Sequence, residues 1–155
     1  LVEKETSTAP DFEKELRARV PFLQWVPFLF MSALTGQRVR RALDLLLEVE
    51  ENRVRRIPTH EVNEVVEALV ARQPPPHSRG RAIRFKYATQ ADTAPPTFVL
   101  FSNLPEEIPD HYVRYLQNGF RRAWGFEGAP VRIRLRSTAR DDLRYGRGGG
   151  RSRAS

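Results

Sequence analysis

Residues able to do chemistry are thinly spread along this sequence. The three histidines, His60, His77 and His111, lie far apart without the clustered spacing of metal ligands, and there is no cysteine. Asp141 and Asp142 stand together inside an arginine-rich stretch, where a solvated break explains them better than a catalytic pair. We therefore expect no metal site and no catalytic residue in this chain.

Two glycine patterns bear on nucleotide and RNA chemistry. The phosphate-binding pattern G-x-x-x-x-G-K-[ST] is absent from the 155 residues, and Gly36 is followed by Gln-Arg-Val-Arg-Arg. The segment Gly125–Gly128 has the G-x-x-G form of loops that clamp RNA backbones. Its Glu127 would repel phosphate, and it joins a predicted helix to a predicted strand. Because glycine commonly ends helices, we expect a structural role for this loop.

The stronger signal is cationic and lies on two predicted strands, where basic residues alternate with apolar ones. The basic positions are Arg84, Lys86, Arg132, Arg134 and Arg136. The apolar positions are Ile83, Phe85, Tyr87, Val131, Ile133 and Leu135. Since alternate side chains point to opposite faces, a sheet with one face under helices would present five cations on the other.

A third predicted strand is apolar on both faces and contains Phe98, Val99, Leu100 and Phe101. Its outward Val99 and Phe101 predict a contact surface. The cationic face then binds RNA or docks another domain, and a solvated basic face is the plain alternative.

The net charge of +7 is concentrated at the C-terminal end. Residues 1–57 contain 10 basic and 9 acidic side chains, residues 58–131 contain 8 of each, and residues 132–155 contain 8 arginines and two aspartates. Arginine suits phosphate contacts through its planar guanidinium group. We expect residues 138–155, with Arg147 and Arg151, to be a disordered arm that contacts nucleic acid, namely rRNA.

The order of predicted elements divides the chain into segments. Residues 11–20, 28–31 and 39–53 predict helix, strand and helix. One strand cannot form a stable α/β domain, because a parallel strand needs sheet neighbours. Residues 1–57 are therefore expected to be the end of a larger domain. Residues 58–137 predict an α-β-β-α-β unit of the α+β class. Its first helix is capped by Thr59, and its second runs from Pro109 to Gly125. The predicted strands are 82–87, 97–102 and 131–136, with a polar connector at 88–96.

Several short motifs, in order, resemble a known family. Ser32-Ala33-Leu34-Thr35-Gly36, between the predicted strand and helix, is similar to the last guanine-recognition loop of translation-factor-class GTPases. Tyr87–Gln90, Pro95–Val99, Tyr115-Leu116 and Gly125–Gly128 resemble the C-terminal KH-like domain of the Der (EngA) family. Leu1–Lys4 is similar to the segment that follows the Asn-Lys-x-Asp motif of that family, and the resemblance covers residues 1 to about 137.

The resemblance implies two successive P-loop GTPase domains followed by this KH-like domain. It implies GTP and Mg²⁺ as cofactors of the whole protein and action late in large-subunit assembly. Residues 1–57 would be the end of the second GTPase domain. Ser32, Ala33 and Leu34 would line the guanine base, with the Ala33 amide reaching the carbonyl oxygen of the base. Leu34 stands where many GTPases have lysine.

Together these features predict the role of the chain. Lacking a phosphate loop and Asn-Lys-x-Asp, it is expected to hold no cofactor and to catalyse nothing alone. The expected partners are rRNA of the large ribosomal subunit and the GTPase domains of the same protein. No apolar run reaches the roughly 18–20 residues of a membrane span and the first residues are no signal peptide, so we expect a cytoplasmic protein without membrane contact. The alternatives are a free-standing RNA-binding module and an interaction domain that only regulates the GTPase domains.

Overall fold

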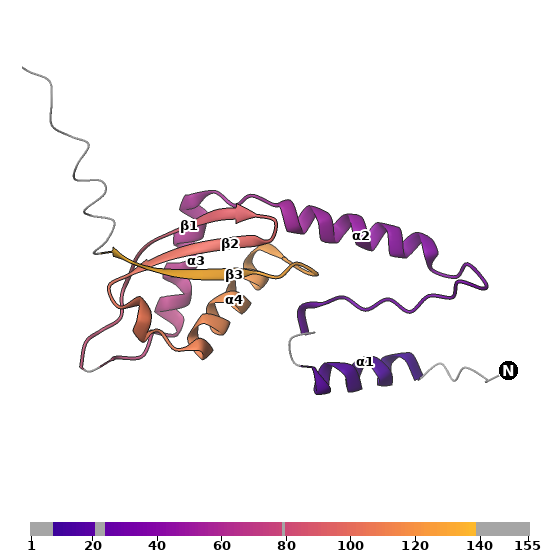
Figure 1. Ribbon diagram of the computed structural model, residues 1–155, viewed down its shortest axis with the longest axis horizontal. Coiled ribbons are helices and arrows are strands. Elements are labelled where there is room, and N and C mark those ends of the chain that lie inside the picture. The colour runs from indigo at the N-terminus through magenta and orange to yellow at the C-terminus, as the bar shows by residue number, and fades with distance from the viewer. Residues whose placement is uncertain (1–7, 21–23, 79, 139–155) are drawn as a thin grey trace, which may run out of the picture.

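The computed structural model describes residues 8–20, 24–78 and 80–138 (Figure 1). The helices are α1 (Thr8–Arg19), α2 (Val39–Val54), α3 (Thr59–Arg72) and α4 (Asp110–Trp124), with a short 3₁₀ helix η2 (Pro105–Glu107). The strands are β1 (Phe85–Thr93), β2 (Pro96–Ser102) and β3 (Arg132–Ser137). None of the helices in these described ranges combines the length and apolar character needed to span a bilayer.

From α3 onward the chain forms one three-stranded mixed sheet in the order β1-β2-β3. β1 and β2 pair antiparallel across a tight turn, and β3 returns parallel to β2 after the crossover through α4. Both α3 and α4 cover the same face of the sheet (Figure 1). The predicted α+β class and the α-β-β-α-β order are thus confirmed.

The core lies between the sheet and these two helices and is largely aromatic. Phe98 on β2 is fully buried, and its ring centroid lies 4.7 Å from that of Phe120 and 5.4 Å from that of Trp124. α3 and α4 approach closely at Gly119, where an added Cβ would be 2.4 Å from Leu69 Cδ1. Glycine inside this helix, which costs stability by propensity, therefore permits the packing.

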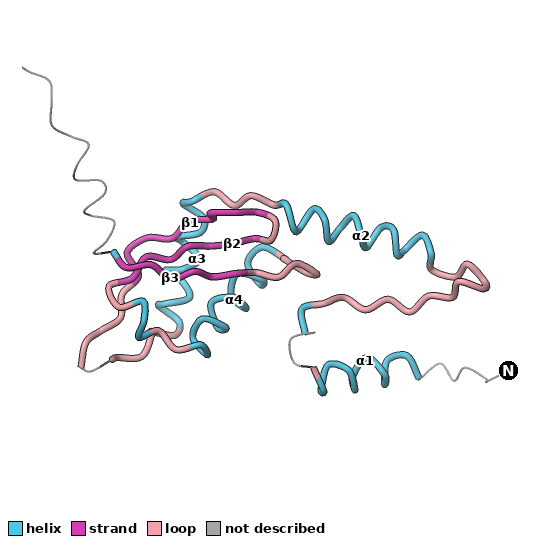
Figure 2. Tube along the Cα trace, viewed as in Figure 1, coloured by secondary structure: helices cyan, strands magenta, loops and turns pink. Residues whose placement is uncertain are grey.

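The predicted strand at 28–31 is wrong. Residues 27–32 form no strand, and Figure 2 shows a loop between α1 and α2. A strand requires hydrogen-bonding neighbours, and the sheet β1-β2-β3 includes none of the described residues 8–20 and 24–57. The segment is instead positioned by side chains: the ring of Phe30 lies 6.3 Å from that of Phe12, and the Arg17 guanidinium lies 4.8 Å from the centre of the Phe28 ring.

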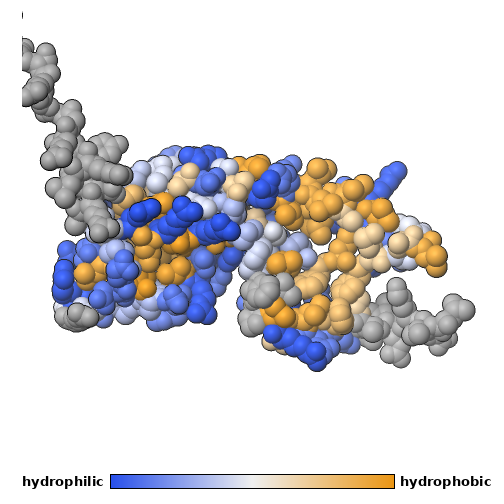
Figure 3. Space-filling view, viewed as in Figure 1, coloured by the Kyte–Doolittle hydropathy of each residue, from blue (hydrophilic) through white to orange (hydrophobic). Residues whose placement is uncertain are grey.

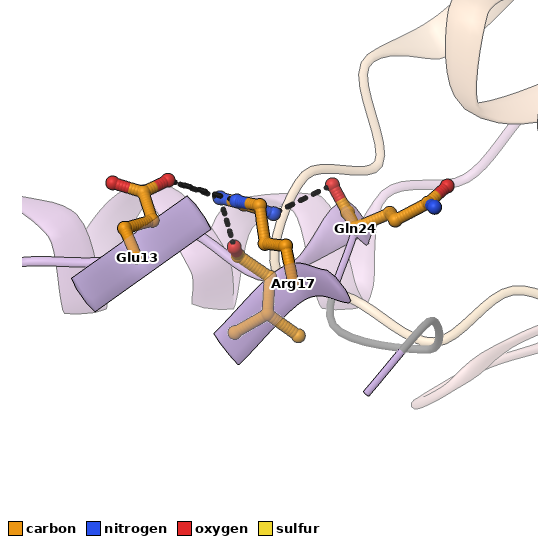
Figure 4. Close-up of polar contacts among 4 residues, drawn as sticks. Glu13, Arg17 and Gln24 are labelled. Carbon is orange, nitrogen blue, oxygen red and sulfur yellow. Dashed lines mark hydrogen bonds and ion pairs between the residues drawn. The ribbon is translucent and has the colours of Figure 1, made fainter. Parts of the chain in front are cut away.

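Arg17 fastens α1 to the segment that follows it (Figure 4). Its side chain donates to Glu13 Oε1 at 2.8 Å within the helix. It also donates to the Gln24 and Val26 carbonyl oxygens, each at 3.0 Å. One guanidinium thus satisfies two backbone acceptors of the segment that follows α1.

Two further predictions are corrected around β1. The predicted connector 88–96 is mostly strand, since β1 extends to Thr93. A bulge between Phe85 and Tyr87 reverses the expected alternation, so that Tyr87 is 45% exposed instead of buried. Thr59 is the first residue of α3 and Pro58 occupies the cap position without a side-chain hydrogen bond, so the predicted cap is one residue off.

Polar residues inside β1 and α3 hold the unit together. Gln90 is 2% exposed, accepts a hydrogen bond from the Ile57 amide at 2.7 Å and donates to the Arg55 carbonyl at 2.9 Å. Asn63 bonds both the amide and the carbonyl of Ala88, each at 2.9 Å. Asn63 thus satisfies backbone groups at the free edge of β1 that no strand pairs, and Gln90 satisfies backbone groups of the segment between α2 and α3.

Candidate nucleic-acid interface

The face of the sheet away from the helices displays a row of arginines. Arg132, Arg134 and Arg136 are all exposed and alternate along β3 with residues that turn toward the core. In the parallel register Val99 lies beside Arg134 and Phe101 beside Arg136. Because β3 is an edge strand, the three guanidinium groups extend along one border of the sheet.

Apolar and aromatic side chains adjoin this row. Val99 and Phe101 on the central strand are half-buried, whereas their neighbours Phe98 and Leu100 are fully buried on the other face. The bulge turns Tyr87 outward, and its ring centroid lies 5.8 Å from that of Phe101. Aromatic rings next to arginines are the combination on which unstacked bases and phosphates bind. In Figure 3 hydrophilic and hydrophobic surface lie side by side over the sheet.

The other two predicted cations are differently placed. Arg84 is exposed but precedes β1, where its amide donates to Asn103 Oδ1 at 2.8 Å. Lys86 is exposed at the bulge of β1. Both therefore lie at the β1 side of the sheet, across β2 from the β3 arginines. Arg147 and Arg151 lie outside the described residues.

The predicted guanine loop forms a tight turn at the end of the N-terminal segment. The Ser32 amide donates to the Gln37 carbonyl at 3.2 Å, and the Thr35 amide donates to Ser32 Oγ at 3.3 Å. Ala33 is exposed and Leu34 is 97% exposed. The sequence provides no lysine-bearing phosphate loop to accompany this turn. The residues present do not fit a bound GTP with Mg²⁺, and no catalytic step is assigned to them.

The G-x-x-G loop joins the two parts of the chain. Gly125 ends α4 in the left-handed conformation, with φ 64°. The Gly128 amide donates to the Trp25 carbonyl at 3.0 Å, and Asn52 donates to the Glu127 carbonyl at 3.1 Å. Arg55 donates to the Trp124 carbonyl. The loop backbone is thus engaged by residues of the N-terminal part, which supports its structural interpretation over RNA clamping.

Sequence reasoning missed a second group of arginines, on α4. Arg114, Arg121 and Arg122 line a cleft together with Trp25. Their spacing of seven and eight residues places them on one side of a helix, so the signal was present in the sequence. The Arg121 guanidinium lies 5.0 Å from the centre of the Trp25 ring, and burial lowers its pKa.

No cluster of three or more histidine or carboxylate side chains suited to a metal ion occurs among residues 8–20, 24–78 and 80–138. The pKa of Tyr112 is raised to about 12, first because the phenol is buried and second because Tyr115 is close. Its hydroxyl donates to the Gln73 carbonyl at 2.7 Å, so it links α4 to the end of α3. Tyr112 therefore has a structural role between the two helices and does not belong to the cationic face.

A mixed three-stranded sheet in the order α-β-β-α-β, with two helices on one face and arginines on the other, defines a KH-like domain. The sequence matches the family described as "KH-domain-like of EngA bacterial GTPase enzymes, C-terminal" over residues 56–136. The chain belongs to this family.

Named relatives agree with the family match. The chain is 53% identical over 134 residues to a protein of Gemmatimonas aurantiaca named GTPase Der, covering 86% of this chain and 31% of the relative. Relatives with the same name from a Synechococcus species and from Flavobacterium psychrophilum are 49% and 43% identical, over 92% and 88% of this chain and 32% and 31% of their own lengths. The chain thus spans about a third of the length of these relatives.

Proposed function

We propose that this chain is the C-terminal part of a tandem GTPase that acts in assembly of the large ribosomal subunit, and that its sheet face contacts rRNA. The observation that supports this most is the exposed row Arg132, Arg134 and Arg136 beside the Tyr87–Phe101 ring pair. Arginine-lined surfaces with adjacent aromatic rings suit RNA, whose unstacked bases and phosphates both find partners there. GTP hydrolysis belongs to domains of the longer protein.

The proposed division of the chain is 1–57 as the end of the second GTPase domain, 58–137 as the KH-like domain and 138–155 as a cationic tail. The apolar side of α2 supports the first boundary, because Leu43, Leu46 and Leu47 are 59%, 65% and 66% exposed. In Figure 3 hydrophobic surface gathers over α2 and the segment before it. Exposed apolar surface of this extent marks a contact, here with the rest of an α/β domain.

The salt dependence of RNA binding tests the sheet face. With a single-stranded RNA, a plot of the logarithm of the affinity against the logarithm of the salt concentration should have a negative slope of about 0.7 per phosphate contact. Changing Arg132, Arg134 and Arg136 to glutamine should therefore reduce the slope by about 2 if each arginine meets one phosphate. The matched control changes three other exposed arginines, Arg40, Arg72 and Arg81. Equal slopes in both triple variants would rule out the sheet face.

A second function is favoured by the same face, namely docking of the GTPase domains. Half-buried Val99 and Phe101 are suited to a protein contact as well as to bases. In the longer protein, Arg132→Glu with Arg134→Glu should weaken ribosome cosedimentation if RNA is the partner. It should instead leave cosedimentation intact and loosen domain contacts, seen as faster hydrogen exchange on β2, if the partner is a GTPase domain. Unchanged behaviour in both assays would remove both functions of this face.

A further inference from the structure

A cleft of about 670 Å³ opens between α4 and the residues Gln24 and Trp25, away from the cationic sheet face. Three arginines of one helix line it, Arg114, Arg121 and Arg122, together with Trp25, Asn118 and Glu127. Its only carboxylate among these lining residues is Glu127, so the cations are in excess by two. A concave surface with excess positive charge concentrates anions.

Arg121 lies at the inner wall of this cleft in an unusual state. Its guanidinium covers the Trp25 ring at 5.0 Å and one of its terminal nitrogens donates to Asn118 Oδ1 at 3.3 Å. Its Nε is buried and has no hydrogen-bond acceptor among the described residues. A buried donor without an acceptor is rare in folded proteins, so Arg121 has spare hydrogen-bonding capacity beside the cleft that its guanidinium group lines.

The neighbouring side chains determine what kind of acceptor fits. Arg114 and Arg122 are exposed; Arg114 lies two turns before Arg121 on α4 and Arg122 directly follows it, and all three side chains line the cleft. Guanidinium forks bind the paired oxygens of a phosphate more specifically than a lysine does. The volume also falls within the usual range of ligand sites, about 300–1,000 Å³.

We propose that this cleft is a second phosphate-binding site, lined by Arg114, Arg121 and Arg122 and bounded by Trp25. The phosphate comes either from an RNA backbone or from a small phosphate in solution, and both present the same oxygens to the arginines. The site stands whether or not the sheet face contacts RNA, because none of its residues belongs to β1, β2 or β3.

The site needs both parts of the chain. The arginines belong to the KH-like domain and Trp25 belongs to the N-terminal part. The hydrogen bonds from the Gly128 amide to Trp25 and from Asn52 to Glu127 hold the two walls together. Occupation of the cleft therefore favours the docked arrangement of the two parts, since a ligand stabilises the state that binds it.

Titration of the 155-residue chain, followed by NMR of the Trp25 indole and the Asn118 side-chain amide at constant ionic strength, tests the site. The two probes are inorganic phosphate and a ten-nucleotide single-stranded RNA. Saturable shifts with both probes identify a general phosphate site, and shifts with RNA alone identify the backbone as the source. Absence of saturable shifts with either probe overturns the proposal.

The variant Arg114→Gln with Arg122→Gln changes only exposed side chains, so the fold should persist. We expect it to weaken the affinity seen at Trp25 at least tenfold. Two controls accompany it: Arg72→Gln with Arg81→Gln removes the same charge elsewhere, and Arg132→Gln with Arg134→Gln alters the sheet face. With either control, the affinity measured at Trp25 should stay within twofold of that of the unchanged chain. If the Arg72 and Arg81 pair weakened the affinity equally, the effect would be one of general charge, and the proposed phosphate site would be overturned.

Discussion

Replacing Gly119 with alanine tests how closely α3 and α4 pack. An exposed glycine inside a helix should gain about 1 kcal/mol when changed to alanine, because alanine has the higher helix propensity. At Gly119 the added Cβ would lie 2.4, 2.6 and 3.1 Å from Leu69 Cδ1, Cδ2 and Cγ, all shorter than van der Waals contact. Leu69 is 9% exposed and belongs to the core, so it cannot turn into solvent.

Overpacking of this kind costs about 1–3 kcal/mol, which exceeds the propensity gain. We therefore expect Gly119→Ala to destabilise the chain by about 1 kcal/mol, where propensity alone predicts stabilisation of similar size. Tyr115 limits any relief, because its hydroxyl donates to the Leu69 carbonyl at 2.9 Å and fixes the spacing of the two helices.

Urea denaturation followed by circular dichroism measures the effect. Ala68→Gly, at an exposed position of α3, measures the difference in helix propensity between alanine and glycine without a change in packing. In a Leu69→Ala background the obstructing atoms are gone, so Gly119→Ala should become stabilising. The reasoning is refuted if Gly119→Ala alone raises the free energy of unfolding by as much as Ala68→Gly lowers it.

Three further experiments test other parts of the structure, two with a substitution and one with the unchanged chain. The pKa of Tyr112 is about 12 in the folded chain, above its usual 10.0, so its contribution to stability should be complete below pH 10 and be lost between pH 10 and about 12. In alkaline denaturation, Tyr112→Phe should therefore show a smaller loss of stability over that range. An unchanged denaturation curve would contradict this role of Tyr112. Gly128→Ala places a Cβ 2.4 Å from Val49 Cγ2 at φ +73°, so amide exchange at residue 128 should accelerate, and unchanged protection would contradict the junction. Calorimetry should detect no micromolar binding of GTP beyond that of ATP; guanine-specific binding would show that Ser32–Gly36 suffices.

The order of elements followed from local patterns. The apolar stripe of α4, the run Phe98–Phe101 and the glycine stop at Gly125 each depend on neighbours in sequence, and the structure forms all three elements. Gly125 has positive φ, as a helix stop of this type requires. Regular periodicity reports which face is buried without reference to the rest of the fold.

The errors arose where long-range pairing decides. Phe28–Met31 has a strand-like composition, yet β pairing requires a neighbour that these residues lack here. The polar stretch after Tyr87 resembles a loop, but Gln90 is buried because Ile57 and Arg55, far away in sequence, provide its partners. The bulge that exposes Tyr87 depends on the register with β2 and leaves no mark in β1 alone.

The candidate sites divide in the same way. The sequence by itself determined the family motifs and the alternation of arginines on β3, because composition and a period of two are local properties. Only the tertiary structure placed Tyr87 beside Phe101 and brought Arg121 over Trp25, since those neighbours are distant in the chain. It also showed the G-x-x-G loop to be a junction, because the loop backbone is already hydrogen-bonded to Asn52 and to the Trp25 carbonyl.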